Sequence, residues 1–409
     1  MITNLENIKE SAADSSTESF FTEVGYMQRN HVGERICGDA FLSQKVKEEN
    51  RTIIVLSDGM GHGVKANLLA TLTATMAVNF TVEHKDVHKI AEIIMNTLPI
   101  CSERKISYST FTIVDVNDNG QTTIINYDNP EPVIFRGQNI YHPNWHCIML
   151  DSGGNKGKEI EACTFNATKE DRIIFFSDGI TQSGLGKGQY LLGYGRENTV
   201  KFLSEKIHDH PDISATKLAS MLVNKANSND QYQSKDDIST VVVYLREPRK
   251  LLLCSGPPYN KEKDTYLIKK IDNFEGKKIL SGGTTADIVS DQLNIPIEDT
   301  LEFTDSDLPP VSKMKGIDLV TEGILTLSKV SGILEKYNER TTLGKGPADE
   351  IIKLFLESDE IRLCIGTAIN VAHQDPNLPV ELEIRRSVAK KIAQLLEQKF
   401  LKEVSLEFI

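Results

Sequence analysis

The sequence predicts an α+β fold for the first 247 residues and a smaller α/β domain for the rest. In the first part, strand-like runs follow one another through short turns and the helical runs are grouped, which is typical of antiparallel sheets with segregated helices. We expect two such sheets between two helix layers. From about residue 250 onward, strand-like and helical runs alternate, as in α/β proteins. Because 409 residues exceed one ordinary core, we predict domains at residues 20–247 and 248–409.

Composition and charge narrow the class of protein. Hydrophobic residues make up 39% and charged residues 25% of the chain, as in soluble globular proteins. The net charge of -12 argues against nucleic acid as the main partner, because nucleic-acid binders usually carry a basic surface. The polar N-terminus lacks the two regions of a signal peptide, and no apolar run approaches the ~20 residues of a membrane span. We therefore expect a cytoplasmic protein that has a flexible arm at residues 1–19 and does not bind membranes.

The six cysteines are scattered and include no C-x-x-C pair, so neither a zinc site nor a redox pair is expected. Buried, reduced thiols are the simpler interpretation. Cys37 lies close to a candidate site residue in sequence, but nothing around it would activate a nucleophile, and we interpret it as a packing thiol.

Hydrophobic periodicity and turn residues predict the elements of the first domain. A helix from Lys65 to Glu83 opens directly after the Gly-rich sequence DGMGHG. Two strands flank the sequence from Asn117 to Gly120, a good hairpin turn. The remaining expected elements are two strands within residues 33–57, a helix at 87–98, a short strand and turn at 132–141, two strands within 159–177, helices within 196–227 that HDHPD interrupts, and a final strand at 236–247.

The second domain is expected to alternate strands with helices. The strand-like runs are KLLLCSG, IDLVTEG, EIRLCIG and VELEIR, and the runs at 324–337 and 387–401 are helical. Residues 280–293 place small residues and Thr284-Thr285 before a helix, where backbone N–H groups could bind an anion. A tight turn with an N-cap is the simpler interpretation. The turns in LVTEG and CIGTA could converge on the same crevice, so we expect a small ligand or a partner protein there that controls the first domain.

Four aspartates at strand ends are the most informative feature of the chain. They are Asp39 in CGDAF, Asp58 in IIVLSDGMGHG, Asp178 in RIIFFSDGI and Asp236 in SKDDISTVVVY. A single Asp-Gly pair usually marks only a turn. Four aspartates at strand ends, two of them followed by Gly, instead indicate a cluster of oxygen ligands, the kind of site that holds Mg²⁺ or Mn²⁺.

The order GDAF, SDGMGHG with a following helix, SDGI and KDDIS resembles the phosphatase domain of the stage II sporulation protein E family over about residues 20–246. That family belongs to the metal-dependent protein phosphatases related to type 2C enzymes. The resemblance implies a type 2C phosphatase-like α/β/β/α sandwich of two antiparallel sheets, and two Mn²⁺ or Mg²⁺ ions between them. It implies that Asp58 bridges both ions, that the Gly59 carbonyl binds one, that Asp178 and Asp236 hold one, and that Asp39 binds the other or orients its waters. Asp237 is a less favoured neighbour of this set.

The implied activity is hydrolysis of phosphoserine or phosphothreonine in a protein. Two divalent ions about 3.5–4 Å apart would neutralise the phosphate and acidify the attacking water. No Cys-x5-Arg loop for a covalent route is present. His62 would protonate the leaving oxygen, or else stabilise the turn by a hydrogen bond. Arg35 would bind the substrate phosphate, or else form a structural ion pair.

The resemblance also implies a setting and leaves alternatives open. Family members often act on anti-sigma-factor antagonists in bacterial partner-switching circuits, and helices near residues 65–98 would switch the metal centre. A homodimer remains open. One alternative is a catalytically silent protein that binds phosphoproteins. Another is an ATP-binding, kinase-like protein, because DGMGHG superficially resembles a nucleotide-binding box, although that leaves SDGI and KDDIS unexplained.

Overall fold

The structure is a computed structural model. It describes residues 20–83, 86–97, 109–150, 157–186, 190–300, 304–338, 341–368, 378–400 and 402–409. The arm expected at residues 1–19 lies outside these ranges. The chain divides into two compact units, residues 1–247 (unit 1) and residues 248–409 (unit 2). In the described part of the chain, no helix is both long enough and apolar enough to cross a membrane.

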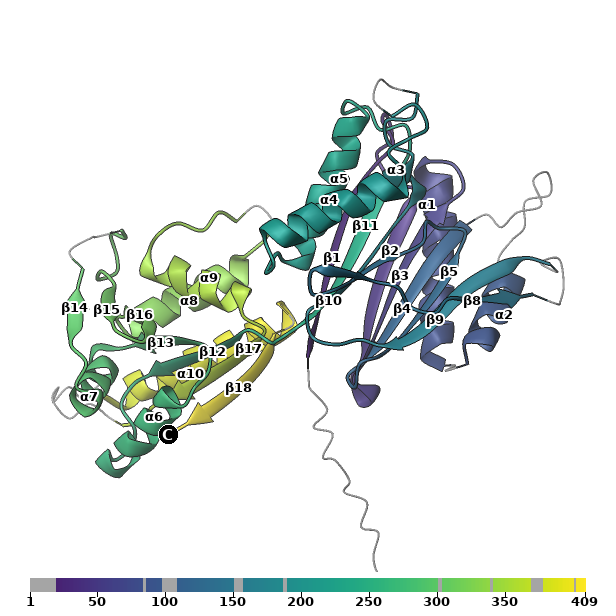
Figure 1. The fold of residues 1–409 in the computed structure, drawn as a ribbon. Coiled ribbons are helices and arrows are strands. Elements are labelled where there is room, and N and C mark those ends of the chain that lie inside the picture. Colours follow the sequence, from purple (N-terminus) through teal and green to yellow (C-terminus); the bar gives the residue numbers. More distant parts are fainter. Residues whose placement is uncertain are drawn as a thin grey trace, which may run out of the picture. The chain divides into compact units, whose positions relative to one another are not determined.

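Unit 1 contains two antiparallel sheets (Figure 1). The six-stranded sheet has the order β2 (Asp39–Val46), β3 (Arg51–Gly59), β4 (Ser109–Asn117), β5 (Gln121–Tyr127), β9 (Glu159–Asn166) and β8 (His146–Met149). The five-stranded sheet has the order β1 (Phe21–Arg29), β11 (Ile238–Arg246), β10 (Asp171–Phe176), β6 (Val133–Arg136) and β7 (Asn139–Tyr141).

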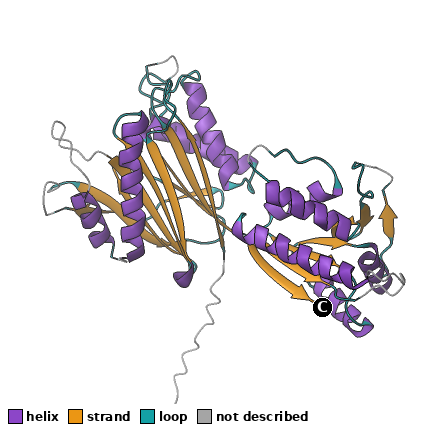
Figure 2. Ribbon diagram, turned by 180° about the vertical axis from the view of Figure 1, so that it is seen from behind, coloured by secondary structure: helices purple, strands orange, loops and turns teal. Residues whose placement is uncertain are grey.

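Three buried apolar layers hold unit 1 together. The inner layer joins the facing sides of the two sheets, for example Leu56 and Val114 with Phe175 and Val243. On the outer side of the six-stranded sheet lie α1 (Gly63–Glu83) and α2 (Val87–Thr97), and on the outer side of the five-stranded sheet lie α4 (Gly195–Asp209) and α5 (Ala215–Asn229) (Figure 2). The α/β/β/α sandwich is therefore confirmed. The short helix α3 (Asp178–Thr181) follows β10, and a 3-10 turn covers Lys47–Glu49.

The close approach of α5 to β1 depends on Gly25. A Cβ at this position would lie 2.2 Å from the carbonyl carbon of Ala215, which no backbone shift within a packed sheet accommodates easily. We expect Gly25→Ala to lower the free energy of unfolding by about 1–3 kcal/mol, measured by thermal or urea denaturation. Gly332→Ala is the matched control, because a Cβ on this helical residue of unit 2 meets no atom within 4 Å. It is expected to stabilise slightly, and an equal loss in both variants would contradict the packing argument.

Unit 2 is a mostly parallel sheet with helices on both faces. Its strand order is β14 (Ile297–Asp299), β15 (Ser312–Met314), β16 (Ile317–Thr321), β13 (Lys277–Ser281), β12 (Lys250–Ser255), β17 (Glu360–Ile365) and β18 (Glu403–Phe408). One face packs on α8 (Ile324–Lys336), α9 (Pro347–Glu357) and α10 (Leu378–Gln398), and the other on α6 (Asp264–Asp272) and α7 (Gly283–Leu293). A 3-10 turn at Lys261–Lys263 precedes α6. The predicted α/β class is confirmed.

The strand expected at VELEIR is wrong, because residues 380–385 lie in α10. The alternating apolar residues of this run fit a strand, but Pro379 in the first turn and the glutamates favour a helix start. The strand that pairs with β17 is instead β18, near the end of the chain, which the sequence analysis missed. In unit 1, β1 was missed as well, because its apolar residues are interrupted by Glu23 and Gly25.

Candidate metal centre

Strand pairing brings the four aspartates together two by two. In the six-stranded sheet, Asp39 at the start of β2 pairs directly with Asp58 near the end of β3. In the five-stranded sheet, Asp178 follows the end of β10, and Asp236 precedes the start of the antiparallel β11. Each pair thus combines the end of one strand with the beginning of its neighbour, and the packing of the sheets brings the two pairs to one site.

The carboxylates affect one another's ionisation. Burial, followed by the charges of Asp39, Asp178 and Asp236, raises the pKa of Asp58 well above its ordinary value. Burial, followed by the charge of Asp178, raises the pKa of Asp236 to about 6. The pKa of Asp178 is also raised, mainly by burial, although its interaction with the Asp58 carboxyl and with the Gly179 N–H opposes this. Burial and the neighbouring negative charges thus make these carboxylates costly to ionise, and a bound cation would offset that cost.

Asp39 is the most deeply buried member of the site. It is 2% exposed, and neither of its carboxylate oxygens has a well-aligned hydrogen-bond partner among the described residues. Burial raises its pKa to about 7, while the nearby hydroxyls of Ser239 and Ser177 lower it in part. These hydroxyls therefore lie near the carboxylate without satisfying it. Two buried oxygens without a donor leave coordination capacity for a cation or its bound water.

Glycines allow the backbone to close around the carboxylates. A Cβ on Gly59 would lie 2.1 Å from the carbonyl oxygen of Ala66, in the first turn of α1. A Cβ on Gly38 would lie 2.6 Å from Oδ2 of Asp237, and one on Gly179 would lie 2.1 Å from the Asp237 carbonyl oxygen. The glycines beside Asp39, Asp58 and Asp178 are thus required by close packing.

The donor set fits Mg²⁺ or Mn²⁺ better than a softer metal. It consists of carboxylates, and hard divalent cations prefer oxygen. Within the described ranges, no three His, Cys, Asp or Glu side chains form a compact cluster around a single point. The aspartates are nevertheless near enough to raise each other's pKa values. Mg²⁺ and Mn²⁺ keep several waters and therefore need few protein ligands.

A histidine pair lies on the loops that adjoin the site. The rings of His31 and His62 stack with centroids 4.3 Å apart, and Nδ1 of His62 lies 2.8 Å from Oε1 of Glu34. The His62 side chain is 53% exposed. The backbone N–H of His31 donates to Oδ1 of Asp237 at 2.9 Å, which ties this loop to the residue beside Asp236. Arg35 is exposed on the same loop, four residues before Asp39.

A family model described as Stage II sporulation protein E (SpoIIE) matches residues 48–246. This segment belongs to the SpoIIE family. The matched residues include Asp58, Asp178 and Asp236, whereas Asp39 lies upstream of them. No curated protein matches the chain in sequence.

Several solved structures resemble the SpoIIE-family unit at low sequence identity. The phosphatase domain of SpoIIE from Bacillus subtilis has 17% identity and a TM-score of 0.42, with 56% of this chain and 94% of that chain covered. The RsbU and RsbW domains of a Mycobacterium tuberculosis protein have 13% identity and a TM-score of 0.44, with coverages of 62% and 68%. RsbX in complex with magnesium has 21% identity and a TM-score of 0.35, with coverages of 56% and 96%.

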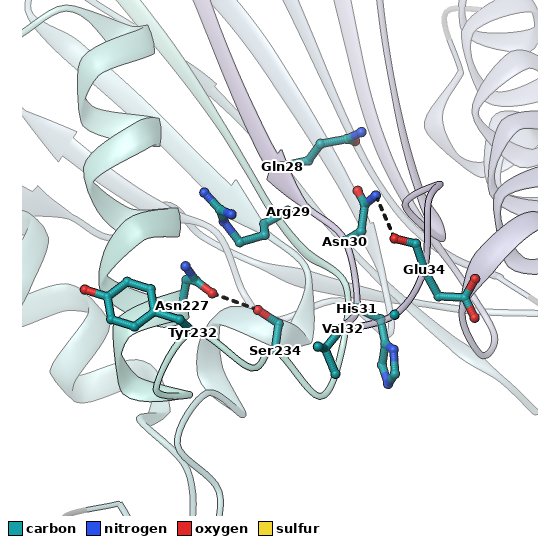
Figure 3. Close-up of a pocket in the computed structure, with 10 residues that line it drawn as sticks. Gln28, Arg29, Asn30, His31, Val32, Glu34, Asn227, Tyr232 and Ser234 are labelled. Atoms are coloured by element: carbon teal, nitrogen blue, oxygen red, sulfur yellow. Dashed lines mark hydrogen bonds between the residues drawn. The ribbon is translucent and has the colours of Figure 1, made fainter.

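The SpoIIE-family unit also carries a polar cavity next to the loops of the site. Its volume is about 440 Å³, and its walls come from residues 28–34 and from Asn227, Tyr232 and Ser234 (Figure 3). The two walls are joined by the hydrogen bond from Val32 N–H to the Ser234 carbonyl, at 2.8 Å. One wall leads along the chain to Asp39 and the other to Asp236, and the N–H of His31 in the first wall donates to Asp237, beside Asp236.

Sequence reasoning missed His31, Glu34, Ser177 and Ser239. The two serines stand inside the SDGI and DDIS motifs and could have been found there, since each lies one to three residues from a predicted ligand. His31 and Glu34 have no such signal, because only the folded loops place them beside His62.

Proposed function

We propose that unit 1 is a metal-dependent phosphatase that hydrolyses phosphoserine or phosphothreonine in a protein. The observation that carries this proposal is the meeting of two aspartate pairs, one from each sheet, around the unsatisfied carboxylate of Asp39. Membership of residues 48–246 in the SpoIIE family supports it. Neither the silent-binder nor the kinase-like alternative accounts for four converging carboxylates.

Two Mn²⁺ or Mg²⁺ ions would be held by Asp39, Asp58, Asp178, Asp236 and the Gly59 carbonyl. Asp58 is assigned to both ions, because its carboxyl interacts with those of Asp39 in one sheet and Asp178 in the other. When bound, the ions would neutralise the phosphate and acidify the attacking water. Asp237 stays the less favoured neighbour of this set: its Oδ1 accepts the His31 N–H, whereas its buried Oδ2 has no hydrogen-bond partner among the described residues.

The remaining groups would handle the substrate. Arg35 is exposed and close to Asp39 in the chain, so its guanidinium is assigned to the substrate phosphate. His62, whose Nδ1 is held by Glu34, would present Nε2 to the leaving oxygen as a general acid.

Substrates with different leaving groups distinguish a general-acid role of His62 from a structural one. Nitrophenolate leaves without protonation, whereas a serine alkoxide requires a proton. We expect His62→Asn to lower kcat for a phosphoserine peptide about 100-fold and to change kcat for p-nitrophenyl phosphate little. Equal losses on both substrates would mean that His62 only supports the turn.

The phosphatase proposal is tested with the full chain and p-nitrophenyl phosphate. We expect hydrolysis that requires Mn²⁺ or Mg²⁺, that EDTA abolishes, and that a phosphoserine peptide inhibits competitively. A protein that binds the phosphopeptide but never hydrolyses it would support the silent binder, and ATP binding would support the kinase-like alternative. Comparing phosphoproteins in cells that carry Asp58→Asn would identify the substrate, for which an anti-sigma-factor antagonist is our candidate.

We also propose that unit 2 controls the phosphatase. Its separate core and its own cavity suit a sensing domain. Deleting residues 250–409 is expected to change the specific activity of unit 1 at least several-fold. Unchanged activity, specificity and oligomeric state after this deletion would exclude a regulatory role for unit 2.

A further inference from the structure

Three loops of unit 2 meet at one edge of its parallel sheet. They follow β12, β13 and β16, and together with α10 they line a cavity of about 510 Å³. The three strands are parallel, so their carboxyl ends lie at the same edge. β12 is the first strand of the unit, β13 and β16 extend the sheet on one side of it, and β17 and β18 extend it on the other. Open α/β sheets bind ligands at such a switch point.

Glycines let the walls of this cavity come close together. A Cβ on Gly366, after β17, would lie 2.2 Å from the carbonyl oxygens of Gly256 and Pro257. Gly256 has a φ of +83°, and a Cβ there would lie 2.6 Å from Nη1 of Arg385 in α10. The Arg385 guanidinium therefore lies against the backbone of the first loop. Any larger residue at Gly256 or Gly366 would collide with these neighbours, so glycine at both positions permits the close approach.

Two helices begin at the cavity. α7 starts at Gly283 and α8 at Ile324, and neither has a side-chain hydrogen bond at its N-cap, Gly282 or Gly323. The first-turn N–H groups and the helix dipole favour an anion there. Helix ends of this kind are common, so they identify a ligand only together with other evidence.

Thr285 supplies independent evidence for a bound group. Its side chain is 0% exposed, lines the cavity, and has no hydrogen-bond partner for Oγ1 among the described residues. Oγ1 faces the Gly282 loop, since it lies 3.4 Å from the position of a Cβ on that glycine. Buried hydroxyls are normally hydrogen-bonded, and a ligand oxygen in the cavity would provide the bond.

The charges around the cavity define the chemistry of the ligand. Arg385 donates to the Gly366 carbonyl at 3.2 Å and adds a positive charge beside the two helix ends. Glu322 lines the same cavity, and its Oε2 is buried without a hydrogen-bond partner among the residues described. A carboxylate repels phosphate but accepts a hydrogen bond from a hydroxyl. The site therefore combines an anion-binding end with an acceptor for a hydroxyl.

We propose that this cavity binds a phosphate ester that carries hydroxyl groups, a sugar phosphate or a nucleotide. The phosphate contacts the N-termini of α7 and α8, Thr285 and Arg385, and a hydroxyl of the same molecule donates to Glu322. The cavity volume lies within the roughly 300–1,000 Å³ of small-molecule sites.

Calorimetric titration of the full chain tests the proposal with ribose 5-phosphate, AMP, ADP, ribose and inorganic phosphate. We expect at least one ester to bind and ribose not to bind, and the comparison of ribose 5-phosphate with AMP and ADP distinguishes a sugar phosphate from a nucleotide. If no ester binds at millimolar concentration, or if inorganic phosphate binds as tightly as every ester, the proposal is wrong.

Variants locate the binding. Thr285→Val and Arg385→Gln are each expected to weaken ester binding about 10-fold or more. Glu322→Gln should weaken ester binding but not the binding of inorganic phosphate, because it removes a charge that repels phosphate. The matched control is Thr326→Val, since Thr326 is also 0% exposed with an unpartnered Oγ1 in the described structure but lies outside the residues that line the cavity. Ester binding that Thr285→Val and Arg385→Gln leave unchanged would overturn the assignment of this cavity.

Discussion

Asp58→Asn is expected to lower Mn²⁺-dependent hydrolysis of p-nitrophenyl phosphate about a thousandfold. Asp58 is the residue whose carboxyl interacts with both aspartate pairs, so its charge would act on both ions. Loss of metal-based charge stabilisation is worth several kcal/mol in the transition state, and each 1.36 kcal/mol corresponds to a factor of about ten in rate. Steady-state kinetics at several Mn²⁺ concentrations measure this loss of activity.

The control for this prediction is Asp118→Asn. Asp118 is an exposed carboxylate in the β4–β5 turn, so its neutralisation changes the net charge equally without touching the site. It should keep full activity. If Asp58→Asn folds normally, as circular dichroism would show, and retains more than about a tenth of the activity, then the assignment of Asp58 to the metals is wrong.

The convergence of the four aspartates could be predicted because each of them stands at a chain position that the sequence marks. Asp58 and Asp178 follow uninterrupted apolar runs with Ser-Asp-Gly, and Asp236 precedes another such run. In antiparallel sheets, strand ends and strand starts coincide, so these residues had to meet once the strands paired. The sandwich followed from the same short strands and grouped helices.

Other features could not be predicted because they depend on contacts distant in sequence. The stacking of His31 on His62 joins two loops, and neither loop has a pattern that specifies it. In unit 2, the alternating residues of VELEIR fit a strand by periodicity, yet the neighbour of β17 came from the last residues of the chain. Periodicity alone does not decide between two candidate partners for one sheet edge.

Asp39→Asn is expected to stabilise the metal-free protein at neutral pH while it lowers activity. The pKa of Asp39 is about 7 in the folded protein, against 3.8 ordinarily, because the carboxyl is buried. Well below pH 3.8 the group is protonated in both the folded and the unfolded state and has no effect. As pH rises from about 4 to about 7, the unfolded state loses its proton while the folded state keeps it, so the free energy of unfolding falls.

The size of this effect is large enough to measure. A raised pKa of this extent corresponds to roughly 4 kcal/mol at pH 8, an upper value because the neighbouring aspartates titrate together. Asparagine has the same shape without the charge. In EDTA at pH 8 the variant should therefore melt on the order of 5–10 °C above the wild type. At pH 5 the unfolded state has already lost most of its proton, so the difference should be roughly 1.7 kcal/mol, less than half of its size at pH 8.

Mn²⁺ should reverse the order of stability, and this distinguishes a metal ligand from a merely strained carboxylate. Bound cations favour ionised Asp39, so Mn²⁺ should raise the melting temperature of the wild type more at pH 8 than at pH 5, and should raise that of Asp39→Asn less. Asp118→Asn should follow the wild type under all four conditions.

If Asp39→Asn instead lowers the melting temperature in EDTA equally at both pH values, the buried carboxylate stabilises the fold through contacts of its own. A loss of activity in that variant would then reflect a damaged structure. The unsatisfied oxygens of Asp39 predict instead that Asp39→Asn raises the melting temperature in EDTA at pH 8, because a charge without a partner destabilises the site until a cation binds.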